Sequence, residues 1–313
     1  MKLTLNDIKR VTVGALQIWE DSNGVHFCKM TPNQLKAFSA LSQSLYTNAC
    51  ANTGVRLDFW TDSPTLSYTP LMNGKYELKL DGFLTPYVTA KQNQPISLSL
   101  GDGKTSHRVT LHLPCHGPEA GIGCVELADG ASLTPHTFDR KFLFIGDSIT
   151  QGWNAKWNTL SYAYQVSDFF NAESIIQGTG GAYYDQSTIE KIDFDPDTVF
   201  VAYGTNDSNK FQTVEEIATR CQAFLKKLIS LFPDAEIIVI TPVWRIDWET
   251  PKAFGHLRLV NECIEKTATA LGLRVIDGTR MIPADSTFMA DNLHPNDLGF
   301  SLYAHNLCRA LLR

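Results

Sequence analysis

The stretch K-F-L-F-I-G-D-S-I-T at residues 141–150 decides the fold of the second half of this 313-residue chain. Its apolar run at 141–145 indicates a buried strand, and a helical pattern follows, so the Ser148 hydroxyl is expected at the carboxyl end of a strand. Strand-like runs then alternate with helical patterns near 160–170, 214–232, 255–271 and 297–312. This alternation predicts an α/β fold with a parallel sheet covered on both faces.

The first half of the chain has a different rhythm. Short alternating runs, such as V-R-L-D-F-W at 55–60 and H-R-V-T-L-H-L at 107–113, are separated by N-G, D-G and G-D-G turns. This pattern is typical of an antiparallel β-sandwich. One helix is expected within it, from Pro32 to about Ser44, because Thr31 can cap it and Pro32 can open it. We therefore predict a β-sandwich over residues 1–138 and an α/β domain over 139–313, with the Pro-containing connector near 132–140 between them.

Composition excludes several classes of partner and of compartment. The formal net charge of −6 is spread along the chain, and no Lys/Arg block stands beside aromatic residues, so nucleic acid is not expected as a partner. No apolar stretch approaches the roughly 20 residues that span a bilayer, and the amino-terminal ten residues do not resemble a signal peptide. The seven cysteines contain no C-x-x-C pair and predict free thiols in a cytoplasmic protein. The oligomeric state is not encoded in any visible pattern.

Four short motifs in the second half carry the chemistry: G-D-S-I at 146–149, G-G at 180–181, G-T-N-D at 204–207 and D-N-L-H at 291–294. Ser148 is the candidate nucleophile, His294 the candidate general base, and Asp291 the carboxylate that orients the imidazole from the same short loop. The candidate oxyanion donors are the backbone N–H groups of Ser148 and Gly181 and the side-chain amide of Asn206. This set predicts serine ester hydrolysis, a reaction that requires no metal and no cofactor.

The four motifs resemble the signature blocks of the SGNH, or GDSL, hydrolase superfamily, and they occur in that family's order between residues 141 and 313. The resemblance implies a flavodoxin-like doubly wound sheet, a triad of Ser148, Asp291 and His294, and an oxyanion hole of Ser148, Gly181 and Asn206. Pro295 completes the D-x-x-H-P form of the last block. The Q-G-T-G-G block is the loosest match, so two other glycines remain candidates beside Gly181, namely Gly178 and Gly180.

The first half is similar to the β jelly-roll domains that precede SGNH domains in some bacterial carbohydrate esterases. The similar segments are L-D-F-W-T-D-S at 57–63 and V-E-L-A-D-G-A-S-L-T-P at 125–135. The resemblance implies a small-molecule or oligosaccharide ester as the substrate, with O-acetyl groups on sugars as the first choice. Three alternatives stay open. The same triad suits a lipase or thioesterase and an acyltransferase, and a carbohydrate-binding protein could retain a silent hydrolase scaffold.

Several of these residues also have a purely structural interpretation. Ser148 could be a helix N-cap, Asn206 could form an Asx turn, and Asp147 is expected to hold its turn through backbone hydrogen bonds. Trp153 and Trp244 follow strand ends and are candidate substrate contacts, with core packing as the alternative.

Arg245 and the histidines of the first half allow two further interpretations. Arg245 either touches the substrate or pairs with Asp247. A zinc site in the first half is not expected, because His107 and His112 are an odd number of residues apart on a strand and so point to opposite faces. The Cys and His residues that follow them match no familiar zinc spacing. These residues are Cys115, His116 and Cys124.

Overall fold

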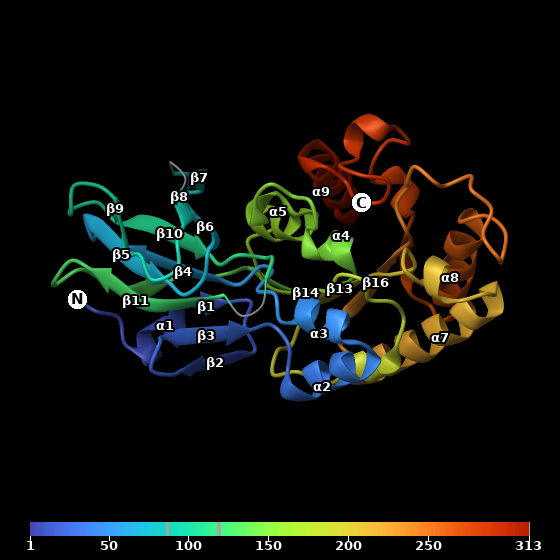
Figure 1. Cartoon of the computed structure of the whole chain (residues 1–313), viewed down its shortest axis with the longest axis horizontal. Helices are drawn as coiled ribbons and strands as arrows, with labels where there is room; N and C mark the ends of the chain where they lie inside the picture. Colours follow the sequence, from blue (N-terminus) through green and yellow to red (C-terminus); the bar gives the residue numbers. More distant parts are fainter. Residues whose placement is uncertain (86–87, 118–119, 313) are drawn as a thin grey trace. The chain divides into compact units, whose positions relative to one another are not determined.

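The computed structural model describes residues 1–85, 88–117 and 120–312, which form two compact units (Figure 1). The β unit comprises Met1–Thr31, Cys50–Phe138 and Trp157–Thr159, and the α/β unit comprises Pro32–Ala49, Asp139–Lys156 and Leu160–Arg313. The division predicted after residue 138 differs from these units at two segments. Residues 32–49 belong to the α/β unit, and residues 157–159 belong to the β unit.

The β unit contains two antiparallel sheets, which confirms the predicted sandwich. The first has the order β1-β4-β10-β6-β7, with β12 paired to β4 and β8 to β6, and the second has the order β2-β3-β11-β5-β9. Phe27, Leu57, Phe59, Val109 and Ile122 are fully buried in its core. The elements of this unit are α1 (Leu5–Val11), β1 (Thr12–Val13), β2 (Gln17–Glu20), β3 (Val25–Cys28), β4 (Arg56–Thr61), β5 (Thr65–Pro70), β6 (Gly74–Leu80), β7 (Phe83–Leu84), β8 (Val88–Ala90), β9 (Ile96–Ser99), β10 (His107–His112), β11 (Gly121–Leu127) and β12 (Thr134–Pro135).

The α/β unit is built on a five-stranded sheet in which every neighbouring pair is parallel, as the alternation of strands and helices predicted. Its strand order is β14-β13-β15-β16-β17, the flavodoxin-like order in which ligands bind beyond the carboxyl ends of the strands beside β13. The strands are β13 (Arg140–Gly146), β14 (Ala172–Gly178), β15 (Thr198–Ala202), β16 (Glu236–Ile240) and β17 (Arg274–Ile276).

The apolar side chains of β13 form a continuous run because they are buried on both faces of the sheet. Phe142, Leu143, Phe144 and Ile145 are all buried, because both faces of a parallel sheet are covered. One face packs against α5 and α9, with Phe142 and Phe144 in the same apolar cluster as residues of those helices. Figure 1 shows α7 and α8 on the other side of this sheet. The helices of the unit are α2 (Pro32–Leu41), α3 (Gln43–Ala49), α4 (Ser148–Gln151), α5 (Tyr162–Phe169), α6 (Asp207–Lys210), α7 (Val214–Leu231), α8 (Arg258–Ala270) and α9 (Asp297–Leu311).

The helix predicted from Pro32 to about Ser44 is in fact two helices, α2 and α3. Ser42 separates them, and its Oγ accepts a hydrogen bond from Leu45 N at 3.1 Å, as an N-cap does for a new helix. The second helix runs on to Ala49, beyond the predicted end.

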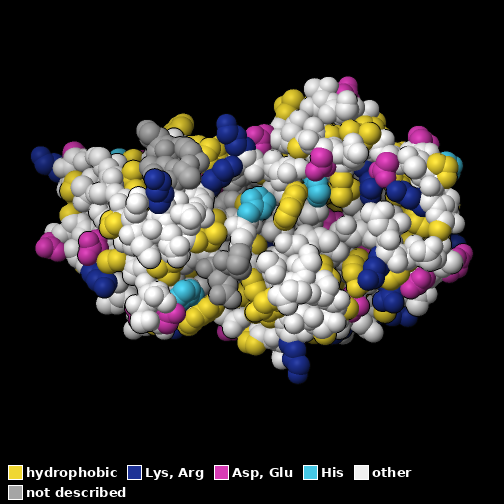
Figure 2. Space-filling view, in the orientation of Figure 1, with side chains coloured by type: hydrophobic (Ala, Val, Ile, Leu, Met, Phe, Trp, Pro, Cys, Tyr) yellow, Lys and Arg dark blue, Asp and Glu magenta, His cyan; other side chains and the backbone are white. Residues whose placement is uncertain are grey.

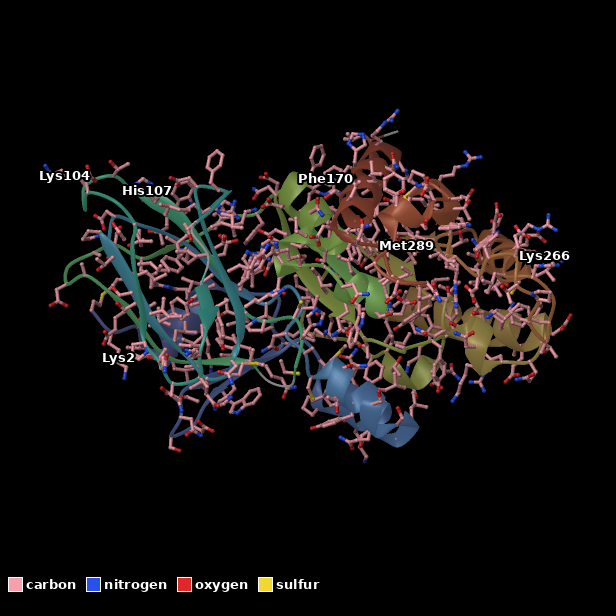
Figure 3. All side chains as sticks on the ribbon, turned by 45° about the horizontal axis from the view of Figure 1, so that its top comes forward. Lys2, Lys104, His107, Phe170, Lys266 and Met289 are labelled. Atoms are coloured by element: carbon pink, nitrogen blue, oxygen red, sulfur yellow. The ribbon has the colours of Figure 1, made fainter. Side chains whose placement is uncertain are left out.

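The face of the protein drawn in Figure 2 carries charged, uncharged polar and apolar side chains intermixed. On the face shown in Figure 2, basic side chains are scattered among acidic and uncharged ones rather than gathered in one patch. Met289, labelled in Figure 3, belongs to the apolar cluster that the parallel sheet forms with α5 and α9. Within the described part of the chain, no helix has the length and apolar character needed to cross a membrane.

Candidate active site

The candidate nucleophile stands at the turn from β13 into α4. Asp147 is the N-cap of α4, and its Oδ1 accepts a hydrogen bond from Ile149 N at 2.9 Å. The structural role predicted for Asp147 is therefore present, and Ser148 is not the cap. Ser148 is instead the first residue of the helix and is 5% exposed. Its hydroxyl is left to interact with side chains beyond the carboxyl end of the sheet.

Ser148, His294 and Asp291 form one hydrogen-bonded series. His294 Nε2 lies 2.9 Å from Ser148 Oγ, and His294 Nδ1 lies 2.9 Å from Asp291 Oδ2. With Nδ1–H donated to the carboxylate, Nε2 is the acceptor for the serine proton. The structure therefore brings the three predicted triad residues together, although Ser148 and His294 are 146 positions apart in the sequence.

Asp291 is held as an anion on a tightly bonded loop. Its Oδ1 accepts hydrogen bonds from Leu293 N at 2.8 Å and His294 N at 2.7 Å. Burial raises the pKa of Asp291, but the hydrogen bonds from the His294 side chain and from these two backbone groups outweigh it and lower the pKa to about 2. Asn154 Nδ2 donates a further hydrogen bond to Asp291 Oδ2 at 2.7 Å. Asn154 is exposed and has a positive φ of 69°. The carboxylate is thus ionised and oriented at neutral pH.

The three glycines of the second motif differ in what their backbones do. Gly178 ends β14, where a Cβ would collide with Gln151 N at 2.2 Å. The N–H of Gly180 is donated to Gln151 Oε1 at 2.7 Å. Gly181 has φ +83°, and no described residue accepts a hydrogen bond from its N–H. Of the three candidates, Gly181 therefore has the donor that is available to a ligand.

Asn206 does not form the Asx turn that was the alternative for it. It precedes α6 without a side-chain capping bond, and its Nδ2 donates to Ala182 O at 2.9 Å. A carboxamide nitrogen carries two hydrogens, so this bond fixes the amide and leaves the second N–H for another acceptor. Asn206 and Gly181 line one pocket, as expected for two donors to the same oxyanion.

Replacing Asn206 by alanine should lower kcat by about 10² to 10³, because one preorganised donor to the oxyanion costs about 2.7–4 kcal/mol when removed. KM for a small ester should change much less. The measurement is steady-state hydrolysis of 4-nitrophenyl acetate, well below the unfolding temperature, since the bond to Ala182 is lost as well. A turnover close to that of the wild type would remove Asn206 from the oxyanion hole.

The first and third motifs each contain a buried carboxyl, Asp147 and Asp207. Burial raises the pKa of Asp147 to about 7, and the charge of Asp207 acts in the same direction. Burial also raises the pKa of Asp207 to about 7, although Tyr184 N and Gly204 N donate hydrogen bonds that lower it. Through these two bonds, at 3.1 and 3.0 Å, Asp207 ties the segment after the second motif to the third motif.

The raised pKa of Asp207 has a consequence for stability. Below the ordinary pKa of 3.8 the carboxyl is neutral in both the folded and the unfolded protein. Between that value and about 7 it ionises in the unfolded chain but stays largely neutral in the folded protein. The free energy of unfolding therefore falls as the pH rises through this range. Asparagine does not titrate. The free energy of unfolding of Asp207→Asn, relative to that of the wild type, should therefore rise between about pH 4 and about pH 8, by up to about 4 kcal/mol. Urea unfolding at both pH values measures this, with the exposed Asp234→Asn as the matched control. A stability difference from the wild type that is the same at both pH values would contradict the prediction.

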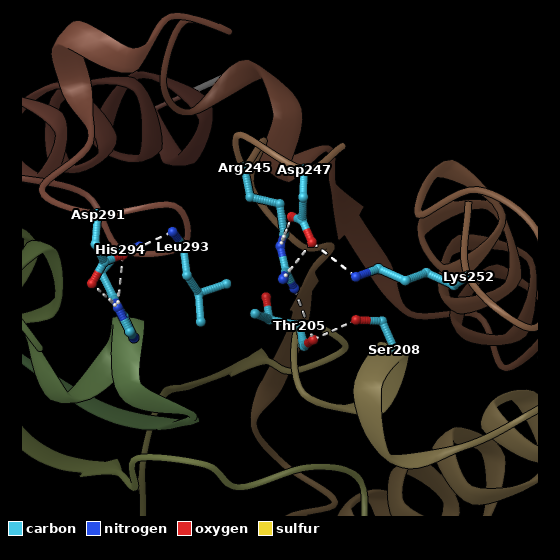
Figure 4. A network of polar contacts seen from close by, with 8 residues as sticks. All are labelled: Thr205, Ser208, Arg245, Asp247, Lys252, Asp291, Leu293 and His294. Carbon is cyan, nitrogen blue, oxygen red and sulfur yellow. Dashed lines mark hydrogen bonds and ion pairs between the residues drawn. The ribbon is translucent and has the colours of Figure 1, made fainter. Parts of the chain in front are cut away.

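Arg245 forms the ion pair with Asp247 that was one of the two interpretations of this residue (Figure 4). Its Nη2 donates to Asp247 Oδ2 at 3.0 Å, and its Nη1 donates to Thr205 O at 3.3 Å, directly before Asn206. Lys252 Nζ completes the group with a 2.8 Å contact to the same carboxylate. This group fixes the turn that carries Asn206.

The two candidate tryptophans lie in different places. The Trp153 ring centroid is 6.2 Å from that of His294, and the residue is 37% exposed. Trp244 packs partly against the apolar cluster of the sheet and, with Trp248, lines a separate groove of about 560 Å³ that includes no triad residue. The structure thus places only Trp153 beside the triad.

Sequence reasoning missed three residues that hold the site: Gln151, Asn154 and Asn48. Asn48, on α3, donates from Nδ2 to Gly180 O at 2.9 Å. Gln151 and Asn154 follow the first motif closely, and that proximity was a usable signal. Asn48 is 132 residues from its partner, so no local pattern could have found it. Among the described residues, no group of His, Cys, Asp and Glu is arranged to hold a metal ion.

Comparison with known proteins agrees with this geometry. The model of the GDSL-like Lipase/Acylhydrolase family matches residues 144–302, just over half of the chain, and this segment contains all four motifs. The chain belongs to this family. It is accordingly an ester hydrolase of the SGNH type, as predicted. No protein of curated function matches the chain in sequence.

Solved structures resemble the chain over nearly its whole length. A salicylyl-acyltransferase from a tetracycline biosynthetic pathway matches with a TM-score of 0.83 and 17% identity, covering 96% of this chain and 93% of that one. A family two carbohydrate esterase from Clostridium thermocellum, in complex with cellohexaose, has a TM-score of 0.71 and 16% identity, with 96% and 98% covered. An acetyl xylan esterase from Butyrivibrio proteoclasticus has a TM-score of 0.65 and 16% identity, with 99% and 98% covered. At these identities the likeness establishes the fold.

Proposed function

We propose that this protein is a serine esterase that removes short acyl groups, acetyl first, from the hydroxyls of a carbohydrate. The observation that carries the proposal is the hydrogen-bonded series from Asp291 through His294 to Ser148, with both imidazole nitrogens 2.9 Å from their partners. Membership of the acylhydrolase family supports the reaction type.

The geometry supports a two-step reaction. His294 Nε2 takes the proton of Ser148 as Oγ attacks the ester carbonyl, and the oxyanion accepts hydrogen bonds from the Ser148 and Gly181 N–H groups and from Asn206. The carbon–oxygen bond to the alcohol then breaks, and His294 returns its proton to the alcohol oxygen. A water then gives a proton to His294 and attacks the acyl carbon. The bond from that carbon to Ser148 Oγ breaks, His294 returns the proton to Oγ, and the carboxylic acid is released.

A sugar as the alcohol is supported by Trp153. The alcohol oxygen must leave on the side of His294, since that residue protonates it. The indole of Trp153 lies on this side, 6.2 Å from the imidazole and partly exposed, where the apolar face of a sugar ring can stack. The fold is also that of a carbohydrate esterase solved in complex with cellohexaose and of an acetyl xylan esterase.

The test is a pair of substrate series assayed with the purified protein. We expect 4-nitrophenyl acetate to be hydrolysed faster than the butyrate and octanoate, and acetate to be released from acetylated xylo- and cello-oligosaccharides. Rates that rise toward octanoate would favour a lipase or thioesterase instead. Release of no acid from any ester, together with tight binding of the deacetylated sugars, would favour a carbohydrate-binding protein.

Acyl transfer is the second candidate, because the same acyl-serine can be attacked by an alcohol in place of water. The likeness in fold to a salicylyl-acyltransferase is the observation that favours it. Product analysis with added sugar or alcohol acceptors separates the two. Free acid as the main product at every acceptor concentration supports hydrolysis, and acylated acceptor as the main product supports transfer.

A cytoplasmic location belongs to the same proposal. All seven cysteines are free thiols, and six of them are buried. Proteins of reducing compartments keep their thiols in this state, which supports the location without depending on the activity.

A further inference from the structure

A pocket of about 310 Å³ opens beside the candidate oxyanion donors. Three segments line it, with residues in the ranges 41–45, 180–183 and 206–210, and we call it the α3 pocket. Its volume is at the lower end of the range for small-molecule sites. All three segments lie in the α/β unit, so the pocket is formed within one unit of the protein.

The α3 pocket lies on one definite side of the reacting ester. Gly181 and Asn206 line it, whereas none of the three candidate triad residues does. In the tetrahedral intermediate the carbon carries Ser148 Oγ, the oxyanion, the alcohol oxygen and the acyl substituent. The alcohol oxygen must face His294 to receive its proton. The substituent that remains for a pocket on the oxyanion side is the acyl group.

The lining of the α3 pocket is partly apolar and partly cationic. Leu41 and Leu45 supply the apolar part, and a Cβ added to Gly181 would lie 3.5 Å from Leu45 Cδ2. Lys210 supplies the charge from the end of α6, with its Nζ 5.2 Å from the centroid of the Tyr183 ring. No described carboxylate lies within ion-pair distance of Lys210. The pocket thus combines a short apolar wall with one ammonium that has no counter-ion among the described residues.

The wall that α3 contributes is held in place independently of any ligand. Asn48 Nδ2 donates to Gly180 O at 2.9 Å, which joins α3 to the glycine loop. Gln34 on α2 and Gln177 on β14 exchange two hydrogen bonds of 3.0 Å between their side-chain amides, and both side chains are buried. A wall fixed in this way binds a substituent without the cost of ordering it.

We propose that the α3 pocket binds the acyl substituent of the ester, and that Lys210 gives it a preference for short acyl groups that end in a carboxylate, such as the succinyl group. The inference rests on the proposed esterase function and widens its acyl range beyond acetyl. The reaction is the same hydrolysis, with a dicarboxylate as the acid released.

The experiment compares two esters of the same alcohol, 4-nitrophenyl hemisuccinate and 4-nitrophenyl butyrate. Their acyl chains have equal carbon number and differ in a terminal carboxylate against a methyl group. The quantity measured is the ratio of their kcat/KM values at low ionic strength. The Ser148→Ala protein supplies the background rate for each ester, because the free carboxylate of a hemisuccinate can assist its own hydrolysis.

We expect the wild type to favour the hemisuccinate, and the ratio to fall about two- to fivefold in Lys210→Gln, the range for an exposed ion pair. Lys210→Glu should lower the ratio further, and added salt should lower it in the wild type. The matched control is Lys226→Gln, which removes an exposed lysine of α7 outside the pocket. A ratio that is unchanged in both Lys210 variants, or changed equally in the control, overturns the role of Lys210.

A bulky residue at the exposed Ser44 tests the position of the acyl group without relying on charge. Ser44→Trp should lower kcat/KM for butyrate relative to acetate several-fold, because the indole occupies space that only the longer chain needs. An unchanged ratio overturns the placement of the acyl group in the α3 pocket. Failure of the esterase proposal looks different, since wild type and Ser148→Ala would then give equal rates with every ester.

Discussion

Replacing Ser148 by alanine should reduce ester hydrolysis by a factor of about 10⁴ to 10⁶. The substitution removes the Oγ atom that is the candidate nucleophile, while the oxyanion donors and the binding pocket remain, so a small residual rate is expected. Ser148 is not the cap of α4, since Asp147 has that role, and the fold should therefore tolerate the change. The measurement is single-turnover and steady-state hydrolysis of 4-nitrophenyl acetate.

Mass spectrometry of the quenched reaction gives an independent readout. The wild type should carry one acetyl group on the peptide that contains Ser148, and the alanine variant should carry none. Ser230→Ala, at an exposed position of α7, is the matched control. Wild-type turnover by Ser148→Ala, or acetyl found on another residue, would contradict the assignment of the nucleophile.

Replacing Asp291 by asparagine should reduce kcat by about 10³ to 10⁴. The carboxylate accepts from His294 Nδ1, and an amide in its place can donate instead, which favours the imidazole tautomer with its proton on Nε2. Nε2 could then no longer accept the Ser148 proton. The pKa of Asp291 is about 2, so the carboxylate is ionised and the loss should be similar at every pH from about 5 to about 8.

The matched control is Asp285→Asn, an aspartate on the same stretch that caps a short helical turn, a role that asparagine also fills. KM should change little in Asp291→Asn, because the carboxylate does not line the α3 pocket. Activity within a few-fold of the wild type would show that His294 is oriented without Asp291, for example through its packing against Trp153.

The prediction of the fold depended on periodicity and succeeded where the signal was local. The apolar run in β13 is buried on both sides, and the helix predicted near 214–232 corresponds to α7. The prediction of one continuous helix from Pro32 was wrong, because Ser42 interrupts it and caps a second helix. Serine is compatible both with a helix interior and with a cap, and only the hydrogen bond to Leu45 N distinguishes the two.

The sequence by itself determined the two kinds of unit and the identity of the candidate triad. Alternating strands and helices require a parallel sheet, and a parallel sheet brings the residues after β13 and β15 to one edge. The motifs carrying Ser148 and Asn206 could therefore be placed together without coordinates. Asp291 and His294 lie on one short loop, so their pairing was also local.

Only the tertiary structure decided which unit the segment 32–49 joins and what it does there. Asn48 meets Gly180 across 132 residues, and Leu45 approaches Gly181 to form the α3 pocket. The sequence of this segment predicts helical structure, but it carries no information about which surface the helices pack against. Helical periodicity records which face of a helix is buried, but the surface that covers it is chosen by packing among residues far apart in the chain.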